Sequence, residues 1–233
     1  MNDKILVLHS GGLDSTVLLY KAIQDADWTA DNVKALNIIY GQKHAKEREY
    51  AEWTCKHLGI EQINADLTDV FKFNPKVSTL LASSGESIEH TAYAEQTAKS
   101  GGKPVATYIP YRNGLFLSYA TAVAYQLGFN KIYYGAHRDD AAGEAYPDCS
   151  PEFILAQATA VWLGSGKRIK IEAPWQDMNK AGIVKAGLRL GMSIKEFEHT
   201  WSCYEGGDTP CGGCGTCRDR RAAFEANGLK NIL

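Results

Sequence analysis

The sequence has no long hydrophobic run. The first apolar stretch spans only residues 5–8 before a histidine follows, whereas a signal peptide or a membrane helix needs a much longer one. We therefore expect a cytoplasmic protein with no membrane partner. Basic charge is also in short supply, because 25 Lys and Arg stand against 27 Asp and Glu, for a formal net charge of −2. No global basic field draws the chain to nucleic acid, and we expect none as a partner.

Cysteine is scarce outside one short segment. Of the six cysteines, only Cys55 and Cys149 lie apart, and the remaining four are Cys203, Cys211, Cys214 and Cys217. A disulfide framework is the weaker interpretation in a reducing compartment. The spacing Cys-x7-Cys-x2-Cys-x2-Cys, with glycines at 212, 213 and 215, lets four thiolates surround one ion, which is typical of structural zinc. An iron–sulfur cluster is the alternative, although this is not a ferredoxin spacing.

Strand-like and helix-like segments alternate along the rest of the chain. We expect strands at residues 5–8, 33–40, 63–67, 131–136 and 168–173, and helices at 15–26, 43–58, 115–127, 179–190 and from Ser150. Residues 115–127 are apolar nearly all round, which favours a buried helix. Residues 74–110, rich in Ser, Gly, Thr and Pro, are expected to form a long irregular excursion.

This alternation predicts an α/β fold with a doubly wound, mostly parallel sheet, helices on both faces and ligands at the carboxyl ends of the strands. We expect one α/β domain over residues 1–200. A small C-terminal zinc module with a terminal helix, residues 201–233, would pack on that domain. Arg218, Arg220 and Arg221 follow the cysteines and are expected either to contact phosphate or a partner, or to form a solvated helix face.

Neither of the common nucleotide-binding glycine signatures is present. A Walker loop needs a lysine after its last glycine, and the Rossmann pattern needs G-x-G-x-x-G. Instead, Ser10-Gly11-Gly12-Leu13-Asp14-Ser15 joins the first predicted strand to the first helix. Glycines let amides approach an anion, and a helix N-terminus adds unpaired N–H donors. Asp14 is placed to hold a magnesium ion; a plain glycine turn with a helix cap is the alternative.

We predict that ATP is bound by this loop and its flanks. The predicted residues are Leu8, His9, Ser10, Gly11, Gly12, Leu13, Asp14, Ser15, Thr16, Val17 and Leu18. The Ser-Gly-Gly-x-Asp-Ser segment resembles the signature of the N-type ATP pyrophosphatases. These enzymes cleave ATP between the α- and β-phosphates and generally adenylate a carbonyl oxygen, so that a nucleophile can displace AMP.

Further segments resemble one family of that superfamily, the 7-cyano-7-deazaguanine synthases, and together they cover nearly the whole chain. They are Tyr40-Gly41-Gln42-Lys43-His44 with Glu47, Ile109-Pro110-Tyr111-Arg112-Asn113, Tyr146-Pro147-Asp148-Cys149 with Glu152-Phe153, and Thr200-Trp201-Ser202-Cys203-Tyr204 before the cysteine cluster. Each segment taken singly also fits a turn or a helix start. Ser150 departs from the arginine that many family members carry.

The resemblance implies a ligase that converts 7-carboxy-7-deazaguanine and ammonia to 7-cyano-7-deazaguanine for queuosine precursor biosynthesis, through adenylated acid and amide intermediates. It implies ATP, Zn²⁺ and Mg²⁺ as cofactors and a homodimer. The candidate catalytic residues are Asp14, Arg112, Asp148 and Lys180. Lys180 also fits a surface lysine, and Cys149 fits either an alternative nucleophile or a small buried residue.

Two other functions fit parts of the sequence. A related adenylating enzyme acting on a macromolecule, such as a tRNA thiolase or a deazaguanine–protein ligase, would share the glycine loop. A nucleotide-sensing module of the universal-stress type would bind ATP without turnover, but it leaves the four cysteines unexplained.

Overall fold

The computed structural model describes residues 3–44 and 46–230, so the outer limits of the two predicted domains, residues 1 and 233, lie outside the described residues. The strands are β1 (Ile5–Leu8), β2 (Val33–Ile39), β3 (Glu61–Asp66), β4 (Lys131–Tyr133) and β5 (Lys170–Glu172). The helices are α1 (Leu13–Asp25), α2 (Lys46–Leu58), α3 (Tyr93–Lys99), α4 (Arg112–Leu127), α5 (Arg138–Ala141), α6 (Pro151–Gly164), α7 (Lys180–Arg189), α8 (Ile194–Glu198) and α9 (Gly215–Glu225).

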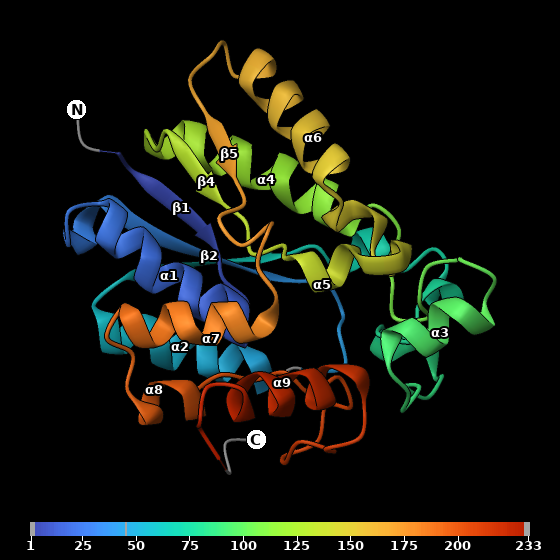
Figure 1. The fold of residues 1–233 in the computed structure, drawn as a ribbon. Helices are drawn as coiled ribbons and strands as arrows, with labels where there is room; N and C mark the ends of the chain where they lie inside the picture. Colours follow the sequence, from blue (N-terminus) through green and yellow to red (C-terminus); the bar gives the residue numbers. More distant parts are fainter. Residues whose placement is uncertain (1–2, 45, 231–233) are drawn as a thin grey trace.

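The strands form one five-stranded sheet in the order β3-β2-β1-β4-β5 (Figure 1). All four neighbouring pairs are parallel. The chain builds outward from β1 to β3, then returns across β1 and builds outward again through β4 and β5. This reversal confirms the predicted doubly wound fold, and it opens a crevice between the carboxyl ends of β1 and β4, where such sheets bind ligands.

Alternate residues of β1 enter two separate cores, as the period of a strand requires. Ile5 and Val7 pack in a core with α1, α2, α7, α8 and α9, here called the first layer. Leu6 packs on the other face with α4 and α6, here called the second layer. Figure 1 shows the two groups of helices on opposite sides of the sheet.

Several element limits differ from the prediction. The helix expected at 115–127 begins at Arg112, and the excursion at 74–110 contains the short helix α3. The expectation that the helix at 115–127, now α4, is buried was wrong for its outer side. There, Tyr119, Tyr125 and Leu127 are 37%, 49% and 43% exposed. Among the described residues, no helix has the length and apolar character needed to cross a membrane.

Candidate functional site

The glycine loop lies at the carboxyl end of β1 and leads directly into α1, for which Gly12 is the N-cap. Gly11 has a φ of +96°, and a side chain there would overlap the main chain of α2 at Glu47 and Ala51. A side chain at Gly12 would meet the Glu47 carboxylate 2.6 Å away. The two glycines are therefore required by close packing against α2 as well as by the turn itself.

Hydroxyl groups and one buried carboxylate hold the loop in place. Ser10 Oγ donates to Glu47 Oε1 at 2.6 Å, accepts from the Gly12 amide at 3.1 Å, and lies 3.1 Å from Ser15 Oγ. The other oxygen of Glu47 lies 3.0 Å from His44 Nε2. Burial opposes ionisation of Glu47, but His44 and Ser10 outweigh it, and the pKa of Glu47 is lowered. The ionised Glu47 thus anchors the loop, a role that the sequence did not reveal.

A charged cluster surrounds the start of α1. Asp14 Oδ2 lies 3.5 Å from Lys180 Nζ and 3.6 Å from His137 Nε2. Burial alone would raise the pKa of Asp14, but Lys180 and His137 outweigh it and the pKa is lowered. In the same way, burial would lower the pKa of Lys180, but Asp14 and Asp140 raise it. Lys180 is therefore a buried ammonium, not a surface lysine.

Asp14 keeps one oxygen free. Its Oδ1 is buried and makes no hydrogen bond within the described part of the chain. The unpartnered carboxylate oxygen suits a magnesium ion, and the buried ammonium of Lys180 beside it suits a phosphate group.

The second layer contributes Arg112, which begins α4. Its guanidinium lies 5.3 Å from the ring centre of Tyr40 and 5.9 Å from that of Phe116, and it donates to the Tyr40 hydroxyl at 3.2 Å. Burial would lower the pKa of Arg112, but Tyr40 and Asp148 raise it. The guanidinium is therefore a fixed cation among aromatic rings.

Asp148 and Cys149 lie next to this cation. Asp148 Oδ2 accepts from the Asn113 amide at 2.9 Å, and burial raises the pKa of its carboxyl group. Cys149 Sγ lies 3.4 Å from both Asn113 Nδ2 and the Tyr134 hydroxyl. Burial raises the pKa of Cys149 well above its ordinary value, which disfavours the thiolate that a nucleophile needs.

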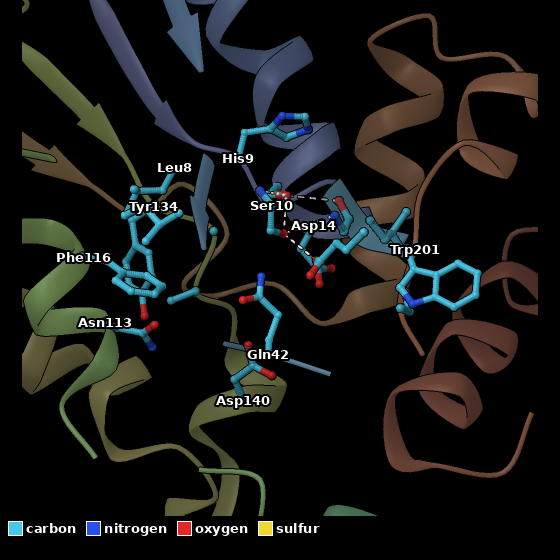
Figure 2. Close-up of a pocket in the computed structure, with 18 of the residues that line it drawn as sticks. Leu8, His9, Ser10, Asp14, Gln42, Asn113, Phe116, Tyr134, Asp140 and Trp201 are labelled. Carbon is cyan, nitrogen blue, oxygen red and sulfur yellow. Dashed lines mark hydrogen bonds between the residues drawn. The ribbon is translucent and has the colours of Figure 1, made fainter. Parts of the chain in front are cut away.

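One cavity collects most of the predicted site residues (Figure 2). Its lining includes Leu8, His9, Ser10, Gly12, Leu13, Asp14, Ser15, Arg112 and Lys180, whereas Gly11, Thr16, Val17, Leu18 and Asp148 do not line it. Thr16, Val17 and Leu18 are buried below the loop. In Figure 2, Leu8, Phe116, Tyr134 and Asn113 group on one side and Ser10, Asp14 and Trp201 on the other, with Gln42 between them.

The C-terminal segment supplies part of the cavity wall, which the sequence did not predict. Trp201, Ser202, Tyr204 and Thr216 all line the cavity. Trp201 reaches it by main-chain pairing with the glycine loop: its amide donates to the Gly11 carbonyl at 3.0 Å. Such pairing joins residues far apart in the sequence and leaves no local sequence pattern.

The four clustered cysteines converge as their spacing predicts. The Sγ atoms of Cys203, Cys211, Cys214 and Cys217 all lie within 4.8 Å of one another, and those of Cys211 and Cys217 are 4.0 Å apart. Four thiolates around zinc, each at about 2.3 Å, stand roughly 3.8 Å from one another. The cluster therefore fits a tetrahedral metal ion held by four thiolates.

Comparison with known proteins places the chain in a family. Residues 4–228 match the family described as "Queuosine biosynthesis protein QueC". The chain belongs to the QueC family. A 7-cyano-7-deazaguanine synthase from Archaeoglobus fulgidus is 39% identical over 99% of this chain and 89% of its own length. Another from Caldicellulosiruptor bescii is 38% identical over 99% and 96%, so these QueC relatives are named as enzymes and match the chain from end to end.

Among solved structures, the NMN synthetase of Francisella tularensis matches with a TM-score of 0.50 and 14% identity, over 99% of this chain and 79% of that one. At this identity the likeness shows the fold alone. It agrees with the parallel sheet described above for this QueC family member.

Proposed function

We propose that this QueC family member converts 7-carboxy-7-deazaguanine and ammonia to 7-cyano-7-deazaguanine at the expense of two ATP. The names of the relatives, which match nearly the whole chain, support the product. The observation that carries the chemistry is the single cavity in which the glycine loop, Asp14 and Lys180 face an aromatic wall with Arg112. One end suits a nucleotide triphosphate and the other suits a flat bicyclic base.

The reaction has two activation steps. In the first, a carboxylate oxygen attacks the α-phosphorus of ATP, pyrophosphate leaves, and ammonia then displaces AMP to give the amide and a proton. In the second, the amide oxygen attacks another ATP, pyrophosphate and a proton leave, and loss of AMP with a second proton gives the nitrile. Each AMP carries away one oxygen of the original carboxylate. Adenylation is needed because oxide is a poor leaving group.

The cavity residues divide these tasks. The Ser15 hydroxyl and the amides at the start of α1 bind phosphate oxygens, and Lys180 neutralises their charge. Asp14 holds the magnesium ion that accompanies the nucleotide through its unpartnered Oδ1. Arg112, fixed by Tyr40, orients the substrate carboxylate. Asp148 acts through Asn113, whose main chain it holds.

The C-terminal module, residues 201–233, binds zinc through its four cysteines and takes no part in bond making. The metal cross-links this segment, in which residues from Tyr204 to Pro210 form neither helix nor strand. Thiolate ligands need a reducing compartment, which supports the cytoplasm as the location.

The outer side of the second layer supports a homodimer. The chain carries no charged residue from Asn113 to Leu127 or from Phe153 to Gly164, yet Leu155 and Leu163 are 69% and 61% exposed. Arg168 and Lys170 lie over Tyr125 and Trp162 of these helices, but the exposed leucines form an apolar patch on which a second copy can pack. Glu152 stands at the start of α6 and Lys167 just past its end. A two-fold axis that sets two copies of α6 antiparallel therefore pairs Glu152 of one copy with Lys167 of the other.

The test is mass spectrometry of purified protein with 7-carboxy-7-deazaguanine, ammonium, ATP and magnesium. We expect the amide first and then the nitrile, with two AMP formed per nitrile. Asp14→Ala should abolish both products, and Asp31→Ala, at an exposed position outside the cavity, should not. If folded, ATP-binding protein forms neither product, the small-molecule substrate is wrong and a macromolecular acceptor takes its place.

A further inference from the structure

Arg220 on α9 is a buried arginine that the proposed chemistry does not use. The sequence left it as a phosphate or partner contact or as part of a solvated face, but only 2% of the residue is exposed. Its NH1 group donates to Thr200 Oγ1 at 2.7 Å and to Ser202 Oγ at 3.3 Å, and its NH2 group donates to the Phe197 carbonyl at 3.0 Å. All three acceptors belong to the segment that precedes the first zinc-cluster cysteine.

The acceptors of Arg220 are neutral oxygens. Within the described residues no carboxylate forms an ion pair with it, and burial lowers its pKa to about 10, which still leaves it charged at neutral pH. Burying a guanidinium without a carboxylate partner is costly compared with an apolar side chain of similar size, even with the Phe224 ring centre 4.8 Å away. The hydrogen bonds of Arg220 therefore point to a task beyond filling space. They fix two side-chain hydroxyls and one carbonyl of the segment 197–202.

That stretch is the one that touches the glycine loop. Trp201, between Thr200 and Ser202, donates its amide to the Gly11 carbonyl and forms a parallel bridge with Gly12. Arg220 itself lies one turn after the zinc-cluster residue Cys217 on α9. Helix α9 and the hydrogen bonds of Arg220 to Thr200 and Ser202 thus connect the cysteine cluster to the segment that pairs with the loop.

A second contact runs the same way. Thr216, in the first turn of α9, lines the cavity and has its hydroxyl 3.3 Å from Cys214 Sγ. Two routes therefore connect the cluster with the cavity, one through Thr216 at the start of α9 and one through Arg220 in its middle.

We propose that Arg220 is a positioning residue for nucleotide binding, holding Thr200–Ser202 against the glycine loop so that the order of the C-terminal module sets the affinity for ATP. This inference rests on the proposed function of the loop. The carbonyl of Gly11 is the acceptor in this pairing, and it shares a planar peptide with the Gly12 amide, which donates to Ser10 Oγ at 3.1 Å. Holding this peptide fixes the turn that leads into α1, where unpaired amides are available to phosphate. Loosening the segment would misalign those donors without changing any group that touches the substrate carboxylate.

The experiment compares variants by calorimetric titration with ATP and by the KM for each substrate. Arg220→Gln is expected to weaken ATP binding about tenfold, the scale of one charge-assisted hydrogen bond, with the KM for 7-carboxy-7-deazaguanine unchanged. Arg220→Lys, which keeps the charge, should recover part of the loss. Arg221→Gln, the exposed neighbour on the same helix, should behave as wild type.

Two milder substitutions at Thr200, which accepts a hydrogen bond from Arg220, test the same idea if the Arg220 variant misfolds. Thr200→Val keeps the shape and removes the hydroxyl, whereas Thr200→Ser keeps the hydroxyl. We expect Thr200→Val to weaken ATP binding about threefold and Thr200→Ser to leave it unchanged, with the zinc content of both equal to that of wild type.

The outcomes separate the hypotheses. Unchanged ATP affinity in folded, zinc-loaded Arg220→Gln overturns the positioning role, and so does an equal rise in the KM for both substrates, which indicates general loosening. If Arg220→Gln does not fold, equal ATP affinities of Thr200→Val and Thr200→Ser overturn it. If wild-type protein does not bind ATP at all, the proposed function fails together with this inference.

Discussion

The two helix layers of this QueC family member are built differently. In the first layer the helices are stacked, since α7 packs on α1 and α9 packs on α7. In the second layer α4 and α6 pack directly on the sheet, and Tyr125, Leu155 and Leu163 on their outer side remain between 49% and 69% exposed. The first layer is thus a closed core, and the second is a core with one side left apolar and exposed.

The division extends to the chemistry. The first layer brings together Asp14, Lys180 and the segment around Trp201, all at the charged end of the cavity. The second layer brings Arg112, Asn113 and Phe116 to the aromatic end. Under the proposed function, one side of the sheet serves the phosphates, and the other serves the base and association with a second copy.

The largest expected effect, on stability, comes from removing one of the four cysteines proposed to bind zinc beside the first layer. Cys214→Ser should lower the bound zinc to well below one per chain and lower the free energy of unfolding by about 5 kcal/mol or more. Proteolysis should begin within residues 201–217. The matched control is Cys55→Ala, a buried cysteine of the same layer outside the cluster, which should keep its zinc. A Cys214→Ser protein with wild-type zinc content would contradict the assignment.

The next effect is on turnover. Asp14→Asn keeps the size of the side chain but removes the charge that faces Lys180. We expect kcat/KM to fall about a thousandfold in both ATP-consuming steps, because charge at the reacting phosphate is stabilised by preorganised groups. Release of pyrophosphate, measured separately with the acid and with the amide as substrate, checks this. A loss confined to one of the two steps would show that Asp14 does not act on the nucleotide.

Acid should destabilise the first layer through His9. Burial lowers the pKa of His9 from about 6.5 to about 4, so the unfolded chain binds the extra proton between these values. The free energy of unfolding should therefore fall by about 3 kcal/mol as the pH drops from 6.5 to 4. His9→Gln should remove this part of the slope in denaturant titrations. Equal slopes for His9→Gln and wild type would rule out the buried neutral histidine.

A charge on the exposed face of the second layer is expected to have the smallest effect on the stability of the fold. Leu155→Glu places a charge on the exposed face of α6 and should convert dimers to monomers in light scattering, weakening association at least a hundredfold by the cost of burying two unpaired charges. The melting temperature of the monomer should change little. Ile194→Glu, at a 54% exposed apolar position of the first layer, is the control. Dimers that survive Leu155→Glu would place the interface elsewhere.

The sequence predicted what depends on neighbours in the chain. The glycine loop follows a strand and opens a helix, and the cysteines converge because their spacing allows it. It did not predict that Lys180 is buried against Asp14, that Glu47 holds Ser10, or that Arg220 lies in the interior. Each of these contacts joins elements that the crossovers of a parallel sheet bring together, and local periodicity carries no record of them.

Apolarity also misled in an instructive way. The run at residues 115–127 predicted a helix buried on every side, but the sheet covers only one side of α4, and Tyr125 stays 49% exposed. A pattern without a polar face indicates that a helix has no side suited to water. It does not tell whether this chain or another covers the second side.

The close packing of Gly11 against α2 has a consequence for protein engineering. Any side chain at position 11 would overlap the main chain of the neighbouring helix, whatever nucleotide is present. A library randomised across residues 10–15 and selected for a new nucleotide preference should therefore return glycine at position 11 under every selection. An invariant glycine there would reflect the close approach of the loop and α2 main chains, not nucleotide specificity. Altered specificity has to be sought at the side chains that line the cavity.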